Sequence, residues 1–191
     1  TDHGVKHHAF FLEKAQIDPE LLNNPAAIVS IKQYQCLIRA VMVATRDESF
    51  GFTPNRLKLG TFAMMCQTII HSDHLEQAIR MCGQFYHVTT EDFRLRLRRG
   101  GETAATIELI FNRPLTGPLS FYTEAIFALA LRLFSWLIDK PIVPLRIDFN
   151  FPIEESGYSF DSKIPGRVWY SQRVSRIHLP AALLLEDVKR D

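Results

Sequence analysis

The stretch CQTIIHSDHLEQAIRMC, from Cys66 to Cys82, gathers residue types that could bind a metal or form a thiol–imidazole catalytic pair. A structural zinc site usually pairs its ligands at tight spacings such as C-x2-C with H-x3-H. Here Cys66 and His71 span a predicted helix end, and Ser-Asp lies between His71 and His74 as in a helix N-cap. A catalytic pair also needs a third, orienting group, which sequence adjacency does not supply. We therefore interpret the stretch as helix, capped turn and helix, without a metal.

The turn in this stretch has its own predicted cap. Asp73 followed by Glu76 resembles a capping box, with Ser72 as the alternative cap. Cys82 falls on the predicted apolar face of the second helix together with Ile79, where a cysteine packs as a small hydrophobe. We expect both cysteines of the stretch to be packing residues.

Glu124 is the most informative single residue, because it interrupts the apolar segment FYTEAIFALALRLFSWLI. An unpaired carboxylate in such a helix is costly. Two interpretations stay open: Glu124 forms a structural ion pair with an arginine such as Arg146, or it lines a ligand cavity between the helix and the sheet. Aromatic side chains with polar groups suit the walls of a pocket. The candidate ligand-binding residues are Glu124, Tyr122, Arg146, Trp136 and Trp169.

Composition bounds the class of protein. The chain has 191 residues, 47% of them apolar and 23% charged, as in a globular protein with one ordinary core. Twenty-two basic residues balance twenty-one acidic ones, so the net charge is +1 and no nucleic-acid footprint of the whole chain is visible. Three scattered cysteines fit a reducing, cytoplasmic setting. Glu124 and Arg132 inside the most apolar segment argue against a membrane span.

Periodicity predicts the elements that position these residues. Asp18-Pro19 suits a helix start, and apolar residues at three-and-four spacing predict a helix over 30–47. Further helices are expected over 57–70, 73–86 and 119–139. The segment PLRIDFNF alternates, with Leu145, Ile147, Phe149 and Phe151 on one face. GRVWYS and SRIHLP are short strands, and PAALLLEDV predicts a helical turn.

FRLRLRR and ETAATIELIF predict a hairpin whose first strand carries a basic stripe. A two-residue loop at Gly100-Gly101 would mix apolar and polar side chains across the pair. A three-residue loop places Leu95 opposite Ala105, Phe93 opposite Ile107 and Arg98 opposite Glu102, so we prefer that register. The stripe of Arg94, Arg96 and Arg98 is either a solvated sheet face or a surface for an anion or a subunit. The order of elements indicates an α+β fold: N-terminal helices plus a mostly antiparallel sheet packed around a central apolar helix.

The order of several motifs resembles one branch of the AraC-type transcription regulators, the branch with an N-terminal effector domain of the "arabinose-binding" type. IDPELLNNP followed by a long helix resembles its opening, and the apolar segment with its early glutamate resembles its later helix. The positions of the family's helix–turn–helix–hairpin pattern are occupied by Gly60, Ser72, Leu75, Ala78 and Tyr86. Ala63 replaces the second glycine of that pattern, and GRVWYSQRVSRIHLP matches only loosely.

The resemblance implies a domain organisation and a function. We expect an N-terminal arm at 1–11, an effector-binding and dimerisation domain at 12–180, and the start of a linker at 181–191. The domain would bind a small-molecule effector of unidentified chemistry, form a homodimer, and act on DNA only through a C-terminal helix-turn-helix domain outside this chain. No cofactor, metal or membrane partner is expected.

Two alternatives belong to other classes of function. A dimerisation module without a ligand would share the same fold. A small cytoplasmic enzyme is disfavoured, because the chain lacks G-x-S-x-G, H-E-x-x-H, P-loop and G-x-G-x-x-G motifs.

Overall fold

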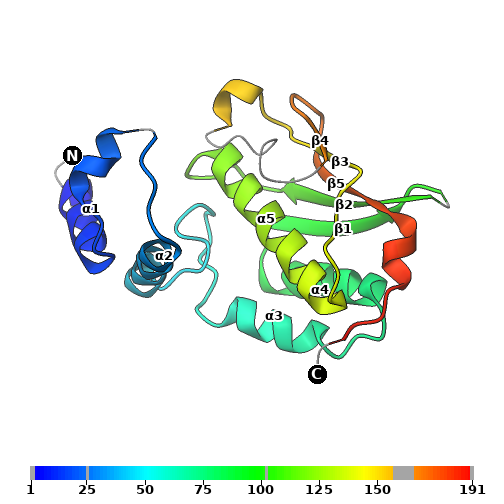
Figure 1. Ribbon diagram of the computed structural model, residues 1–191. Helices are drawn as coiled ribbons and strands as arrows, with labels where there is room; N and C mark the ends of the chain where they lie inside the picture. The colour runs from blue at the N-terminus through cyan, green and yellow to red at the C-terminus, as the bar shows by residue number, and fades with distance from the viewer. Residues whose placement is uncertain (1–2, 25, 102, 157–165, 190–191) are drawn as a thin grey trace. The chain divides into compact units, whose positions relative to one another are not determined.

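The computed structural model describes residues 3–24, 26–101, 103–156 and 166–189 (Figure 1). They form two compact units, one of residues 1–51 and 56–59 and one of residues 52–55 and 60–191. The expected domain of residues 12–180 spans both. The helices are α1 (His3–Lys14), η1 (Pro19–Asn23), α2 (Ile31–Thr45), α3 (Thr61–Ile69), α4 (Leu75–Thr89), α5 (Leu119–Ile138), η2 (Ile153–Glu155) and η4 (Ala181–Leu185). The strands are β1 (Phe93–Arg99), β2 (Ala104–Phe111), β3 (Arg146–Asp148), β4 (Arg167–Trp169) and β5 (Ser175–Pro180).

The first unit consists of α1, η1, α2 and the loop that follows them. Its small core contains Leu12, Ala15 and Ile17, against which Leu37 of α2 packs. The expected helix start at Asp18-Pro19 is confirmed, because the Asp18 side chain accepts a hydrogen bond from the Glu20 backbone N–H. The residues expected as an N-terminal arm, 1–11, contribute most of α1.

The second unit contains a five-stranded sheet in the order β1-β2-β5-β3-β4. All neighbouring pairs are antiparallel except β3 and β4, which run parallel. One row across the sheet aligns Ile107, Ile177 and Ile147, and each of these side chains is at most 2% exposed. This row faces α5, which lies along one side of the sheet (Figure 1). The α+β class, the mostly antiparallel sheet and the central apolar helix are therefore confirmed.

The long helix α5 is the core helix of this unit. Its inner face includes Phe127, Phe134 and Leu137, and none of these side chains is more than 3% exposed. Among the described helices, only α5 is long and apolar enough to cross a bilayer, yet half of its most apolar stretch is buried inside the fold. Burial of a 20-residue apolar helix between the sheet and its neighbours explains its composition without a membrane.

The predicted hairpin exists, but its predicted register is wrong. Leu95 lies opposite Leu109, and Phe93 lies opposite Phe111, four positions beyond their predicted partners. The turn has the predicted length of three residues but lies two positions later than predicted, since the last hydrogen bond of the ladder, from the Gly100 N–H to the Ala104 carbonyl at 2.8 Å, leaves residues 101–103 between the strands. A shift of the register by an even number keeps the same side chains on each face, so alternation alone could not exclude the predicted position of the turn.

Two predicted helix boundaries are also wrong. The helix expected over 57–70 begins only at Thr61, because Gly60 adopts a left-handed conformation with φ of 94°. The capping box of Asp73 and Glu76 does not form: the N-cap of α4 is His74, without a side-chain cap. The carboxylate of Glu76 instead binds Arg80 and Arg99. Leu145 was predicted to share the buried face of Ile147 and Phe149, but its side chain is 52% exposed.

Gly83 allows α4 to lie against β1. A Cβ at this position would meet the backbone carbonyl oxygen of Leu95 at 2.5 Å, closer than any real contact. We predict that Gly83→Ala destabilises the protein by about 1–3 kcal/mol, as overpacking does, despite the roughly 1 kcal/mol that alanine gains in a helix. Chemical denaturation measures the change.

The matched control is Gly100→Ala, because a Cβ there would meet its nearest neighbour at an ordinary 3.5 Å. That variant should remain within about 0.5 kcal/mol of the wild type. Equal stability of the Gly83→Ala variant and the wild type would contradict the close packing of α4 on β1.

Candidate functional site

The segment from Cys66 to Cys82 is a helix pair joined by a turn, as predicted. Cys82 is buried in α4, and burial raises the pKa of its thiol to about 12. A thiol with this pKa stays protonated near neutrality and is a poor nucleophile. The turn residue His74 places Nδ1 3.0 Å from Oδ1 of Asp187. Within the described residues, no group of three or more His, Cys, Asp or Glu side chains is arranged to hold a metal ion.

Glu124 lies on the inner side of α5 and is 5% exposed. The Ser156 hydroxyl donates a hydrogen bond to its Oε1 at 2.6 Å, and the Tyr170 hydroxyl lies 3.5 Å from the Ser156 oxygen. Burial raises the pKa of Glu124, and the hydrogen bond from Ser156 offsets only part of this effect. In the described part of the chain no lysine or arginine pairs with this carboxyl group.

An aromatic cluster adjoins this polar group through Tyr170. The ring of Phe149 stacks on Phe127 at 5.7 Å and on Phe151 at 4.8 Å, and Tyr170 lies 5.6 Å from Phe149. These rings come from α5, the segment after β3 and the residue after β4, and the Tyr170 hydroxyl joins them to the Ser156 hydroxyl that binds Glu124. The result is an apolar wall with a carboxyl group and two hydroxyls, the composition of many small-molecule sites.

Tyr122 and Trp136 occupy other parts of α5. The Tyr122 ring stacks on Phe52 at 5.2 Å and lies 6.0 Å from Phe111, so it closes the core at the start of the helix. Trp136 is 48% exposed near the other end of the helix. In the described residues neither ring stacks on Phe149, Phe151 or Tyr170. Of the candidate residues on α5, the structure therefore supports only Glu124 at this site.

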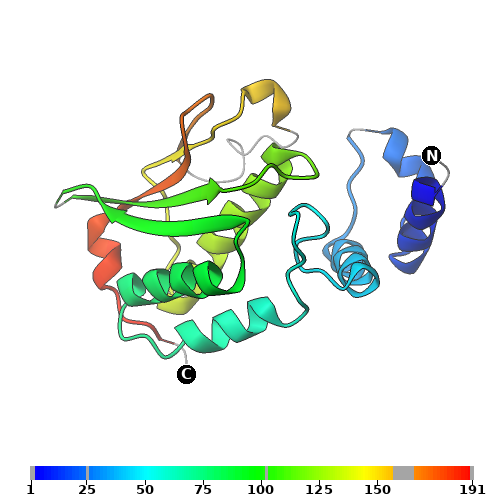
Figure 2. The same ribbon diagram turned by 180° about the vertical axis from the view of Figure 1, so that it is seen from behind.

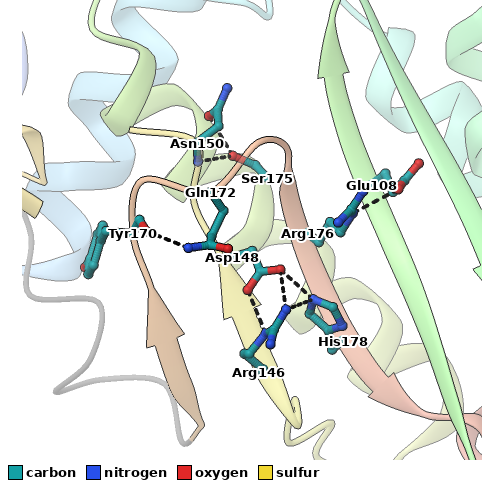
Figure 3. A network of polar contacts seen from close by, with 9 residues as sticks. All are labelled: Glu108, Arg146, Asp148, Asn150, Tyr170, Gln172, Ser175, Arg176 and His178. Carbon is teal, nitrogen blue, oxygen red and sulfur yellow. Dashed lines mark hydrogen bonds and ion pairs between the residues drawn. The ribbon is translucent and has the colours of Figure 1, made fainter. Parts of the chain in front are cut away.

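Arg146 and Trp169 lie together, but on the opposite face of the sheet. The Arg146 guanidinium lies 4.3 Å from the Trp169 ring centroid, and its Nε lies 2.7 Å from Oδ1 of Asp148. His178 places Nε2 2.8 Å from Oδ2 of the same carboxylate (Figure 3). The interpretation of Arg146 as the ion-pair partner of Glu124 is therefore wrong, because Arg146 binds Asp148 on the face of the sheet that points away from α5.

A second buried carboxylate on that face, Glu108, shows the contrast with Glu124. Arg98 and Arg176 donate hydrogen bonds to it at 2.7 and 2.9 Å. Burial opposes its ionisation, but the two guanidinium groups outweigh that effect and lower the pKa of Glu108. Glu108 and Asp148 are thus structural ion-pair members, whereas Glu124 is buried without a cation among the described residues.

An open depression of about 600 Å³ lies at the end of the sheet, between the loop after β2 and the segments that follow β3 and β4. Its lining includes Ile110, Arg113, Leu115, Leu119, Asn150 and Arg173. None of the five candidate residues lines it. No local sequence pattern indicates this hollow or Ser156, because each depends on how segments distant in the chain meet.

The raised pKa of Glu124 has a defined effect on stability. Because the folded state holds this proton more tightly than the unfolded state, the stabilising contribution is complete below the ordinary pKa of 4.5 and is lost as pH rises through the folded-state pKa. We predict that the wild type loses stability relative to the Glu124→Gln variant between acid and neutral pH. Chemical denaturation of both proteins across this range measures the difference, and a constant difference would contradict the assignment.

Comparisons with known proteins place this chain in a family. The model of the "Arabinose-binding domain of AraC transcription regulator, N-term" matches residues 7–188. The crystal structure of the transcriptional regulator CdpR from Pseudomonas aeruginosa is similar in fold, with a TM-score of 0.55 and 13% sequence identity. The alignment covers 99% of this chain and 58% of that one. A search of curated proteins finds no match. The chain belongs to the family of arabinose-binding N-terminal domains of AraC transcription regulators, a family of ligand-binding regulatory domains.

Proposed function

We propose that this domain senses a small-molecule effector that contacts Glu124. The observation that carries the proposal is a buried carboxyl group with raised pKa, bound by the Ser156 hydroxyl, which lies next to the hydroxyl of Tyr170. Such a group is costly to keep in a core unless a partner uses it. The family membership supports a regulatory role and not a catalytic one.

The chemistry of the site favours one class of effector. A carboxylate accepts hydrogen bonds and attracts cations, while neighbouring hydroxyls both donate and accept. Arg146, the candidate for an anionic effector, is already paired with Asp148. We therefore infer an effector that carries an ammonium or hydroxyl group, such as an amine, an amino acid or a sugar, in preference to a fatty acid.

A route from this site to other parts of the protein runs along α5. At the far end of the helix, the Lys189 N–H donates to the Leu137 carbonyl at 2.8 Å, and Lys140 pairs with Glu186 at 2.5 Å. A displacement of α5 by the effector would therefore act on the segment 186–189. Such a displacement requires that the effector bind two states of the domain with different affinity.

The wider proposal follows the family. The domain of residues 12–180 would form a cytoplasmic homodimer, with 181–191 leading toward a DNA-binding domain that reads the effector state. A dimerisation module without a ligand is the second candidate. The exposed side chains of Phe121, Leu129 and Trp136 along the outer side of α5 favour a contact surface there.

The test is effector binding by the Glu124→Gln variant, which keeps the shape of the side chain and removes its charge. We predict that basic amino acids, polyamines or hexoses include a ligand that raises the melting temperature of the wild type. The variant should bind that ligand about tenfold or more weakly by calorimetry, which corresponds to roughly 1.4 kcal/mol.

The matched control is Asp92→Asn, since Asp92 is a buried carboxylate held by the Asn55 backbone and side chain. This variant should lose stability but keep the ligand affinity of the wild type. Equal ligand affinity of the Glu124→Gln variant and the wild type would move the effector site elsewhere, and stabilisation by fatty acids alone would contradict the chemistry.

A further inference from the structure

The sheet has one face without a described helix. Both views show α5 on the other side of the strands (Figures 1 and 2). The open face carries the side chains that alternate with the buried row, so polar residues gather there. One row across four strands aligns Arg96, Glu108, Arg176 and Asp148, and Trp169 follows on β4. This charged row lies one residue from the apolar row that faces α5.

Positive charge is concentrated on this open face. Its arginines are Arg94, Arg96, Arg98, Arg146, Arg167 and Arg176. Against these six guanidinium groups stand two carboxylates, Glu108 and Asp148, so the described face carries a surplus of four positive charges before any charge on His178. The whole chain carries only +1, so the rest of the chain has an excess of three negative charges. A neutral protein with this asymmetry has an oriented electrostatic field.

The ion pairs within this face neutralise only some of its arginines. Glu108 binds Arg98 and Arg176, and Asp148 binds Arg146. Within the part of the chain that the structure describes, no ion pair or hydrogen bond is recorded for the side chains of Arg94, Arg96 and Arg167. Arg94 and Arg96 lie on β1 and Arg167 lies on β4, at opposite edges of the sheet. Without a described carboxylate partner these guanidinium groups do not stabilise the sheet, so the fold itself gives no reason for them.

We propose that this open sheet face binds an extended acidic segment of a partner protein. Arg94 and Arg96 are two residues apart on one strand, and about 6.6–6.8 Å separates such side chains. The segment crosses the face from β1 to β4, a span of about 19 Å or roughly six extended residues, because four strand spacings separate these two edge strands. Trp169, which is 46% exposed beside Arg146 on β4, adds an aromatic surface at the far end of the segment.

Nucleic acid fits the face less well than an acidic peptide. A protein that holds single strands stacks successive bases on several aromatic rings, and Trp169 is the one tryptophan, tyrosine or phenylalanine in the described rows of this face. A duplex-binding domain usually has a large overall basic excess, and this chain has +1. The interaction with the acidic segment would be weak, fast and sensitive to salt, as for exposed charge pairs.

The test uses Trp169 as a local reporter. The chain has two tryptophans, so Trp136→Phe leaves Trp169 as the only one. A peptide of alternating glutamate and threonine should change the Trp169 emission saturably at low ionic strength, and added salt should reverse the change. In this background, Arg94→Ser together with Arg96→Ser should weaken peptide binding about tenfold.

The charge-matched control is Arg39→Ser together with Arg132→Ser, two exposed arginines outside this face. It should leave peptide affinity within about twofold. Arg167→Ser is a further variant of this face, with a single substitution. Circular dichroism melting checks that each variant folds. Equal weakening by the control pair, or no saturable change of Trp169 emission, would overturn the proposal. Tighter binding of oligothymidylate than of the peptide, with the same arginine dependence, would overturn it in favour of a nucleic-acid surface.

Discussion

Burial of α5 is the constraint on which the second unit depends. A helix this apolar must be covered, and the sheet supplies the cover through the row Ile107, Ile177 and Ile147. Because side chains alternate along a strand, turning this row toward α5 turns the charged row away from it. One packing requirement therefore fixes an apolar interior and a charged open face at once.

The same constraint separates two kinds of buried carboxyl group. Glu108 and Asp148 point away from α5, where long arginines reach them and cover them from solvent. Glu124 points inward from α5 itself, where the sheet presents apolar side chains and the nearest described partner is a serine hydroxyl. The two outer carboxylates keep the face together, whereas the inner one has no cationic partner among the described residues.

Alternation and helical periodicity were sufficient to predict the elements and their apolar faces from the sequence. They were not sufficient for the hairpin register, since Leu95 meets an apolar residue in the predicted and in the observed pairing. The partner of Glu124 was missed for a different reason. Alternation within RIDFNF already puts the side chain of Arg146 on the other face of the strand from Ile147, and so away from α5. The sequence pattern was therefore enough to exclude Arg146 as the partner of Glu124. Ser156 lies 32 residues from Glu124 in the chain, and no local pattern connects them.

The ionisation of Glu124 tests the central claim most directly, that its buried carboxyl group has no cationic partner in the part of the chain that the structure describes. Carbon-13 NMR follows the side-chain carboxyl of each glutamate through a pH titration, and the Glu124→Gln variant identifies the signal by its loss. The structure predicts a titration midpoint above the ordinary value of 4.5. A midpoint at or below 4.5 would show that a cation or further donors hold the carboxylate, and Glu124 would then be a structural residue and not the effector contact.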